Sequence, residues 1–192
     1  MNWVKDKTGR FDRRPHYQPG ELDTECEHII LSFLKAKYGK IDFPIKTNDL
    51  TILLEQKADL DSYADLSGEP GDVEGLTEFV RGKRPVVKIA NSLSAAHLEN
   101  RLRTTLTYEF GHVHFHQFIF EAEAKPQSLF GSVHATERSG NTCKRESILN
   151  ASESNWMEWQ AGYVCASILM PVAHSSIQFS YFARTTIFPS AI

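Results

Sequence analysis

The sequence predicts an α+β fold in which a small sheet of three or four strands packs against helices. Two segments, 21–38 and 94–118, repeat apolar residues at three- and four-residue steps, as one buried helix face requires, and a third helix is expected over 156–169. Short β-like runs separate the first two of these segments. The 192 residues, 41% of them hydrophobic, suffice for one domain with a substantial core. We therefore expect a single domain over residues 1–173, with residues 1–20 as an extended arm.

Composition excludes several classes of protein. A balance of 21 Lys and Arg against 24 Asp and Glu gives no overall field that attracts nucleic acid or an anionic membrane. The three cysteines are far apart and lack C-x-x-C spacing, which favours a reducing compartment. The first residues lack the apolar stretch of a signal peptide, and the most apolar segment, 159–173, is too short and too broken to cross a bilayer. We expect a cytoplasmic protein with no direct nucleic-acid binding and no membrane contact.

The first half of the chain is predicted to contain one helix and several strands. The helix over 21–38 ends at Gly39, a residue that commonly terminates helices. Four short runs are expected as strands: 50–54, 62–66, 76–80 and 86–90. The last two flank Arg81-Gly82-Lys83-Arg84-Pro85, a loop suited to a hairpin, whose charges we interpret as solvated.

The second half is dominated by two helices. Segment 94–118 carries one apolar stripe, formed by Leu98, Leu102, Leu106, Phe110 and Val113. Segment 121–151 shows neither period strongly and is predicted as a long loop. The helix over 156–169 is stopped by Met170-Pro171, and we assign Cys165 and Met170 to the core. The tail, 174–192, differs in composition from everything before it, which indicates a truncated or out-of-frame end or a final packed strand or loop.

One edge of the helix over 94–118 carries functional side chains. At 3.6 residues per turn, Tyr108, Glu109, His112 and His116 lie on one side, next to the apolar stripe. The spacing differs by one residue from H-E-x-x-H, in which two histidines bind zinc and the glutamate deprotonates the metal-bound water. Tyr108 stands at the first histidine position.

A zinc site of this kind needs a third protein ligand from another segment. The candidate is Glu158, in the helix over 156–169. An alternative remains open, because Asn155 and Glu158 have N-cap spacing, and the carboxylate could turn back on its own helix.

Three motifs together resemble the ImmA/IrrE family of zinc metallo-endopeptidases. They are YEFGH at 108–112, EWQAGY at 158–163 and ILMP at 168–171, and the resemblance extends over roughly Leu22 to Pro171. It implies a zincin-like helical domain with a small sheet, whose active-site helix carries the degenerate H-E-x-x-H motif. It also implies a zinc-dependent endopeptidase that cleaves a regulatory, repressor-like protein in stress responses or mobile elements.

The resemblance assigns roles to four residues. Glu109 is expected to be the general base and His112 and Glu158 the zinc ligands, whereas Tyr108 stands at the position where the family has its first ligand histidine. Removing even an outer partner of a metal ligand costs ~10–100-fold in affinity, so losing a ligand should cost at least that. A tyrosine side chain is also longer and ordinarily ionises only near pH ~10. Weak or absent zinc is therefore expected.

Two alternatives follow from this departure. The chain could be a degenerate, catalytically impaired pseudopeptidase that acts as a protein- or peptide-binding regulatory module. The other alternative is a shifted ligand set of Glu109, His112 and His116. The competing interpretation of His114 and His116 is that they face solvent or form hydrogen bonds. A DNA-associated regulator lacks support, since no helix-turn-helix pattern is present.

A peptide substrate is expected to bind as an added strand. The segment 86–89, just before the motif helix, is the candidate sheet edge, with Val87 and Lys88 as substrate-binding residues.

Overall fold

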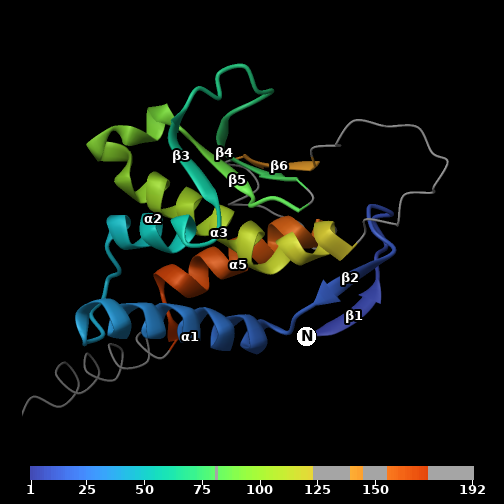
Figure 1. Ribbon diagram of the computed structural model, residues 1–192, viewed down its shortest axis with the longest axis horizontal. Helices are drawn as coiled ribbons and strands as arrows, with labels where there is room; N and C mark the ends of the chain where they lie inside the picture. The colour runs from blue at the N-terminus through green and yellow to red at the C-terminus, as the bar shows by residue number, and fades with distance from the viewer. Residues whose placement is uncertain (81, 123–138, 145–154, 173–192) are drawn as a thin grey trace, which may run out of the picture.

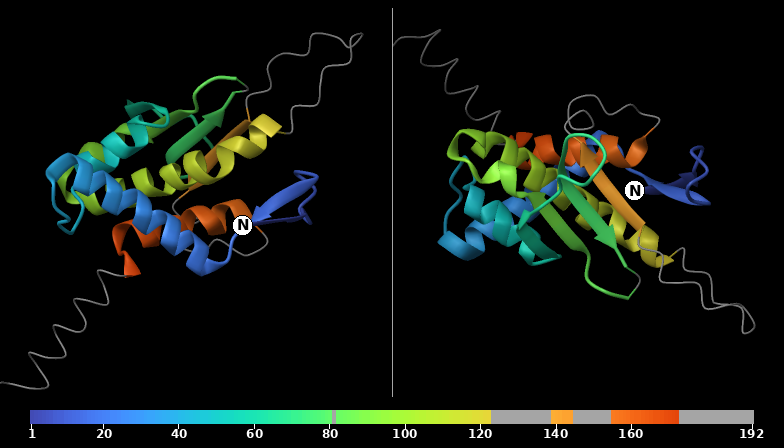
Figure 2. Two further views of the ribbon diagram at one scale, coloured as in Figure 1. Left: turned by 60° about the horizontal axis from the view of Figure 1, so that its bottom comes forward. Right: turned by 90° about the horizontal axis from the view of Figure 1, so that it is seen from above.

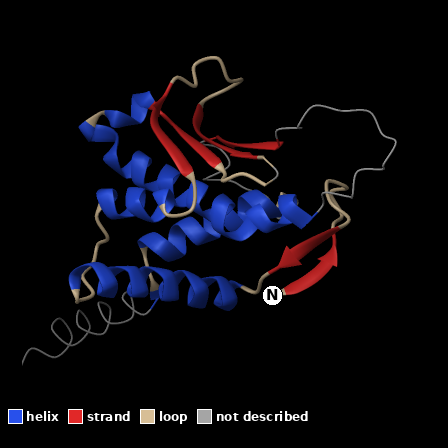
Figure 3. Ribbon diagram, in the orientation of Figure 1, coloured by secondary structure: helices blue, strands red, loops and turns tan. Residues whose placement is uncertain are grey.

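The computed structural model describes residues 1–80, 82–122, 139–144 and 155–172 and has a mixed α+β architecture (Figure 1). The described helices are α1 (Pro19–Tyr38), α2 (Thr47–Glu55), α3 (Glu99–Ala122) and α5 (Trp156–Leu169). The described strands are β1 (Asn2–Lys5), β2 (Arg13–His16), β3 (Asp59–Ala64), β4 (Val73–Phe79), β5 (Val86–Ala90) and β6 (Ser139–Lys144). Figure 3 shows the larger group of strands on one side of the helices.

The larger sheet has four strands in the order β3-β5-β4-β6. Strand β5 runs parallel to β3 and antiparallel to β4, which confirms the hairpin predicted for 76–80 and 86–90. Strand β6 pairs antiparallel with β4 and lies inside segment 121–151, which the sequence predicts as a loop. The prediction is wrong there because Ser-Gly-Asn-Thr-Cys-Lys has no apolar alternation to mark a strand. Residues 123–138 and 145–151 of that segment lie outside the described residues.

Helix α3 lies between the sheet and α5, with α1 on the far side of α5 (Figure 1). The segment 50–54, predicted as a strand, belongs to α2. Its buried residues Leu50, Leu53 and Leu54 have i, i+3, i+4 spacing, so they share one helix face. Helix α3 starts at Glu99, later than predicted, because two short 3₁₀ turns, Asn91–Ser94 and Ala96–Leu98, precede it.

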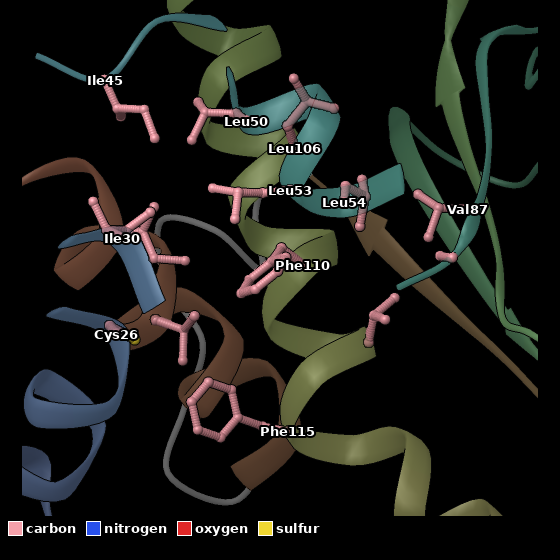
Figure 4. Packing of buried hydrophobic residues seen from close by; sticks show 14 of the residues in the cluster. Cys26, Ile30, Ile45, Leu50, Leu53, Leu54, Val87, Leu106, Phe110 and Phe115 are labelled. Carbon is pink, nitrogen blue, oxygen red and sulfur yellow. The ribbon is translucent and has the colours of Figure 1, made fainter. Parts of the chain in front are cut away.

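The main core forms where α1, α2, α3 and β5 meet (Figure 4). It contains Cys26, Ile30, Leu50, Leu53, Leu54, Val87, Leu106 and Phe110, all buried. Cys165 is also buried, as expected, whereas Met170 is 67% exposed, so its assignment to the core is wrong. Met170 follows the last turn of α5, where the chain leaves the helix layer.

The expected extended arm is a β-hairpin formed by β1 and β2. Its loop is closed by the buried Asp6 carboxylate, which accepts hydrogen bonds from the Thr8 hydroxyl and the main-chain N–H of Thr8 and Phe11. Phe11 packs edge-on against Trp156 of α5 at 6.1 Å between ring centres. The hairpin is therefore docked on the helices.

Among the described helices, none combines the length and apolar character needed to cross a membrane. The tail, 174–192, lies outside the described residues.

Candidate functional site

The site lies where α3 and α5 cross at close range. A Cβ placed on Gly111 of α3 would come within 3.0 Å of the Cα atom of Ala161, so the two backbones nearly touch. A Cβ on Gly162 would lie 3.6 Å from the ring of Tyr108. Glycine and alanine allow this approach because larger side chains would hold the helices apart. The crossing directs two motif residues of α3, Tyr108 and His112, toward α5.

Tyr108, His112 and Glu158 come together at this crossing. The Tyr108 hydroxyl donates a hydrogen bond to Glu158 Oε2 at 2.7 Å and lies 3.2 Å from the main-chain oxygen of the same residue. His112 Nε2 lies 3.6 Å from Glu158 Oε1. Tyr108 and His112 are fully buried, and Glu158 is only 7% exposed. The structure thus places together the three residues predicted at the metal position.

The alternative in which Glu158 caps its own helix is not seen. Within the described residues, Asn155 at the start of α5 makes no side-chain cap hydrogen bond, and the Glu158 carboxylate is directed at α3. The signal that could have separated the two interpretations is the pair of small residues Gly111 and Ala161, which brings α3 within reach of Glu158.

The pKa shifts of His112 and Glu158 favour a charged pair. Burial raises the pKa of Glu158, but the polar contact and charge of His112, together with the hydrogen bond from the Tyr108 hydroxyl, outweigh it, so the pKa lies below its ordinary value. Burial lowers the pKa of His112, but the polar contact and charge of Glu158 outweigh it, so that pKa is raised. Both shifts favour a protonated imidazole beside an ionised carboxylate.

Glu109, the expected general base, faces the sheet rather than α5. Its Oε2 accepts a short hydrogen bond from the Thr77 hydroxyl of β4, and its side chain is fully buried. A Cβ on Gly75 would collide with the Glu109 carboxylate and come within 2.9 Å of Thr105 Cγ2. Gly75 therefore leaves the room that the carboxylate occupies. Sequence reasoning missed Gly75 and Thr77, although an isolated glycine within a strand is a known sign of close approach.

His116 belongs to a buried hydrogen-bonded chain. Its Nδ1 lies 3.1 Å from His112 Nδ1, and its Nε2 lies 3.0 Å from Gln160 Oε1. The Gln160 amide in turn donates to the main-chain oxygen of Pro15 at 3.2 Å. The interpretation of His116 as a hydrogen-bonded histidine is confirmed, and the role of Gln160 was missed. His114 lies apart from this chain, with Nε2 3.2 Å from the Glu25 carboxylate.

The residues present do not fit a tight zinc site. Zinc in such sites is held by three protein ligands at about 2.0–2.2 Å, with water in the fourth position. His112 and Glu158 provide two ligands, but the third position holds the Tyr108 hydroxyl, whose proton is directed at Glu158.

The segment 86–89 does not offer the edge expected for substrate. Strand β5 is paired with β3 on one side and β4 on the other. Val87 is fully buried, and the Lys88 ammonium group bonds to the Glu78 carboxylate at 2.8 Å. The interpretation of Val87 and Lys88 as strand-adding residues is wrong because their main-chain groups are already used within the sheet.

Comparisons with known proteins add no assignment to this geometry. No protein-family model matches the chain, and no curated protein matches it. The resemblance to ImmA/IrrE peptidases therefore remains a prediction based on the motifs at 108–112, 158–163 and 168–171.

Proposed function

We propose that this chain is a degenerate, catalytically impaired relative of the zincin-like ImmA/IrrE metallo-endopeptidases that acts as a protein- or peptide-binding regulatory module. The observation that carries the proposal is the buried hydrogen bond of 2.7 Å from the Tyr108 hydroxyl to Glu158 Oε2. This hydrogen bond joins Tyr108, which stands where the family has histidine, to Glu158, which is expected to be the zinc ligand from the second helix.

The energy of this contact argues against a resident metal. A hydrogen bond to a charged group contributes roughly 1.5–3 kcal/mol in proteins. A cation held by both carboxylate oxygens of Glu158 would have to displace the Tyr108 hydroxyl from Oε2, and the Tyr108 side chain is fully buried. The raised pKa of His112 favours the protonated imidazole, which places a positive charge beside Glu158 without a metal ion.

A second candidate is a zinc-dependent endopeptidase that cleaves a repressor-like regulatory protein. The observation in its favour is that the His112 imidazole and the Glu158 carboxylate face each other at 3.6 Å, with Glu109 buried on the same helix. In that case Glu109 is the expected general base.

The experiment compares the wild-type chain with Glu109→Gln and with Glu25→Gln, an exposed carboxylate on α1 as a matched control. Each protein is supplied with zinc and incubated with a broad peptide library and with repressor-like proteins. We expect no hydrolysis above background from any of the three, and peptide binding that a chelator does not change. Zinc-dependent cleavage that Glu109→Gln abolishes and Glu25→Gln preserves would overturn the proposal and establish the second candidate.

A further inference from the structure

We propose that Gln160 and His116 are positioning residues through which the N-terminal hairpin fixes a proton on Nδ1 of His112 and directs its Nε2 to Glu158. This inference rests on the proposed function only in placing His112 and Glu158 at the site. It makes the hairpin, which the sequence suggested was a mere arm, a structural part of that site.

The main-chain oxygen of Pro15 sets which group donates and which accepts at each step of the buried hydrogen-bonded series. A carbonyl oxygen only accepts hydrogen bonds, so Gln160 must present its amide N–H to Pro15, at 3.2 Å. The other end of the amide, Oε1, then faces His116 Nε2 at 3.0 Å. Because an amide oxygen also only accepts, His116 must carry a proton on Nε2.

The same logic carries the proton assignment to His112. Two buried imidazoles in contact do not both hold a charge, and His112 is the one that faces a carboxylate. His116 is therefore the neutral ring, with a lone pair on Nδ1 because its proton is on Nε2. The 3.1 Å contact between the two Nδ1 atoms then requires His112 to be the donor. Nε2 of His112 is left as the nitrogen that faces Glu158.

The Pro15 carbonyl is held in place by the packing of the hairpin. Phe11 is buried against Trp156, and the Arg14 guanidinium lies 5.5 Å from the centre of the same indole ring. Figure 2 shows the hairpin against the N-terminal end of α5, the helix that carries Gln160. Outer partners of this kind fix the orientation of a functional histidine and typically change its metal affinity ~10–100-fold.

The direct test is nitrogen NMR of the metal-free wild-type protein labelled at histidine. From about pH 5 to about pH 9, the Nδ1 atom of His112 should keep the signal of a protonated nitrogen, while any change occurs at Nε2. Gln160→Met, which is similar in size but cannot hydrogen bond, removes the acceptor for the His116 Nε2–H group, so the Nδ1 signal of His112 should move from its wild-type position. Gln117→Met is the control, because the Gln117 amide bonds to Glu121 on the exposed side of α3, away from His112.

A neutral His112 that carries its proton on Nε2 in the wild-type spectrum would overturn the proposal without any variant. Unchanged His112 signals in folded Gln160→Met would also overturn it. A second readout uses Tyr108→His, in which Gln160→Met should weaken zinc binding ~10–100-fold and Gln117→Met should not. Because the spectrum is recorded without metal, it stands even if wild-type protein proves to bind zinc.

Discussion

Removing a single oxygen atom from Tyr108 should destabilise the fold more than the same change at an exposed tyrosine. In Tyr108→Phe the ring keeps its edge-on packing with His112, whose centre lies 5.3 Å away, so little besides the hydroxyl is lost. That hydroxyl donates to a buried ionised carboxylate at 2.7 Å. We therefore expect the free energy of unfolding to fall by about 1.5–3 kcal/mol, the usual range for bonds to charged groups.

Tyr163→Phe is the matched control. Tyr163 lies on α5 and donates to Asp23 at 2.9 Å, but its side chain is partly exposed, so water can replace the lost bond. A loss of about 0.5–1.5 kcal/mol is expected there. In a chain of this length each kcal/mol corresponds to about 2–4 °C in the midpoint of thermal unfolding.

The assay is chemical denaturation followed by circular dichroism, with a chelator present so that metal cannot contribute. The difference between the two variants is the decisive quantity. If Tyr108→Phe costs no more than Tyr163→Phe, the Tyr108 hydroxyl does not donate to a buried carboxylate, and the reasoning about the site fails.

Three further predictions concern the framework. Gly111→Ala should lower the free energy of unfolding by about 1–3 kcal/mol in denaturation experiments, because the new Cβ would lie 3.0 Å from the backbone of α5. Gly20→Ala is the control and should not lower it, because no described atom lies within 4 Å of a Cβ at that position. Burial raises the pKa of Asp49, but the hydrogen bonds from Lys37 and Tyr38 and the charges of nearby lysines together outweigh it, so the pKa is lowered. The contribution of Asp49 to stability is therefore present above about pH 4, and the stability difference from Asp49→Asn should shrink as the pH falls below that value. Burial raises the pKa of Cys26 to about 12, so peptide mapping should find this thiol alkylated at about pH 8 only after unfolding.

Periodicity predicted the parts of the fold whose apolar residues repeat along a single element. The helix over 156–169 was predicted with its observed limits, and the helix over 21–38 ends at Gly39, whose left-handed conformation lets its N–H reach Lys35. Segment 50–54 was misassigned because a short apolar run fits either period, and only its packing against α3 decides. Strand β6 has almost no apolar residue to signal its place in the sheet.

The motif residues of the site were found from their spacing, but their partners were not. Tyr108, His112 and Glu158 meet as the motif predicts. Thr77 and Gln160 are ordinary polar residues whose roles arise from the packing of β4 on α3 and of the hairpin on α5, so no local pattern marks them.

The central claim is that Tyr108 occupies the place of a metal ligand, and calorimetric titration with zinc tests it most directly. We expect wild-type protein to bind zinc weakly or not at all. Tyr108→His should bind one zinc ion at least ~10–100-fold more tightly, since it restores an imidazole beside His112 and Glu158. Equal affinities in the two proteins, or one tightly bound zinc ion in the wild type, would contradict the account.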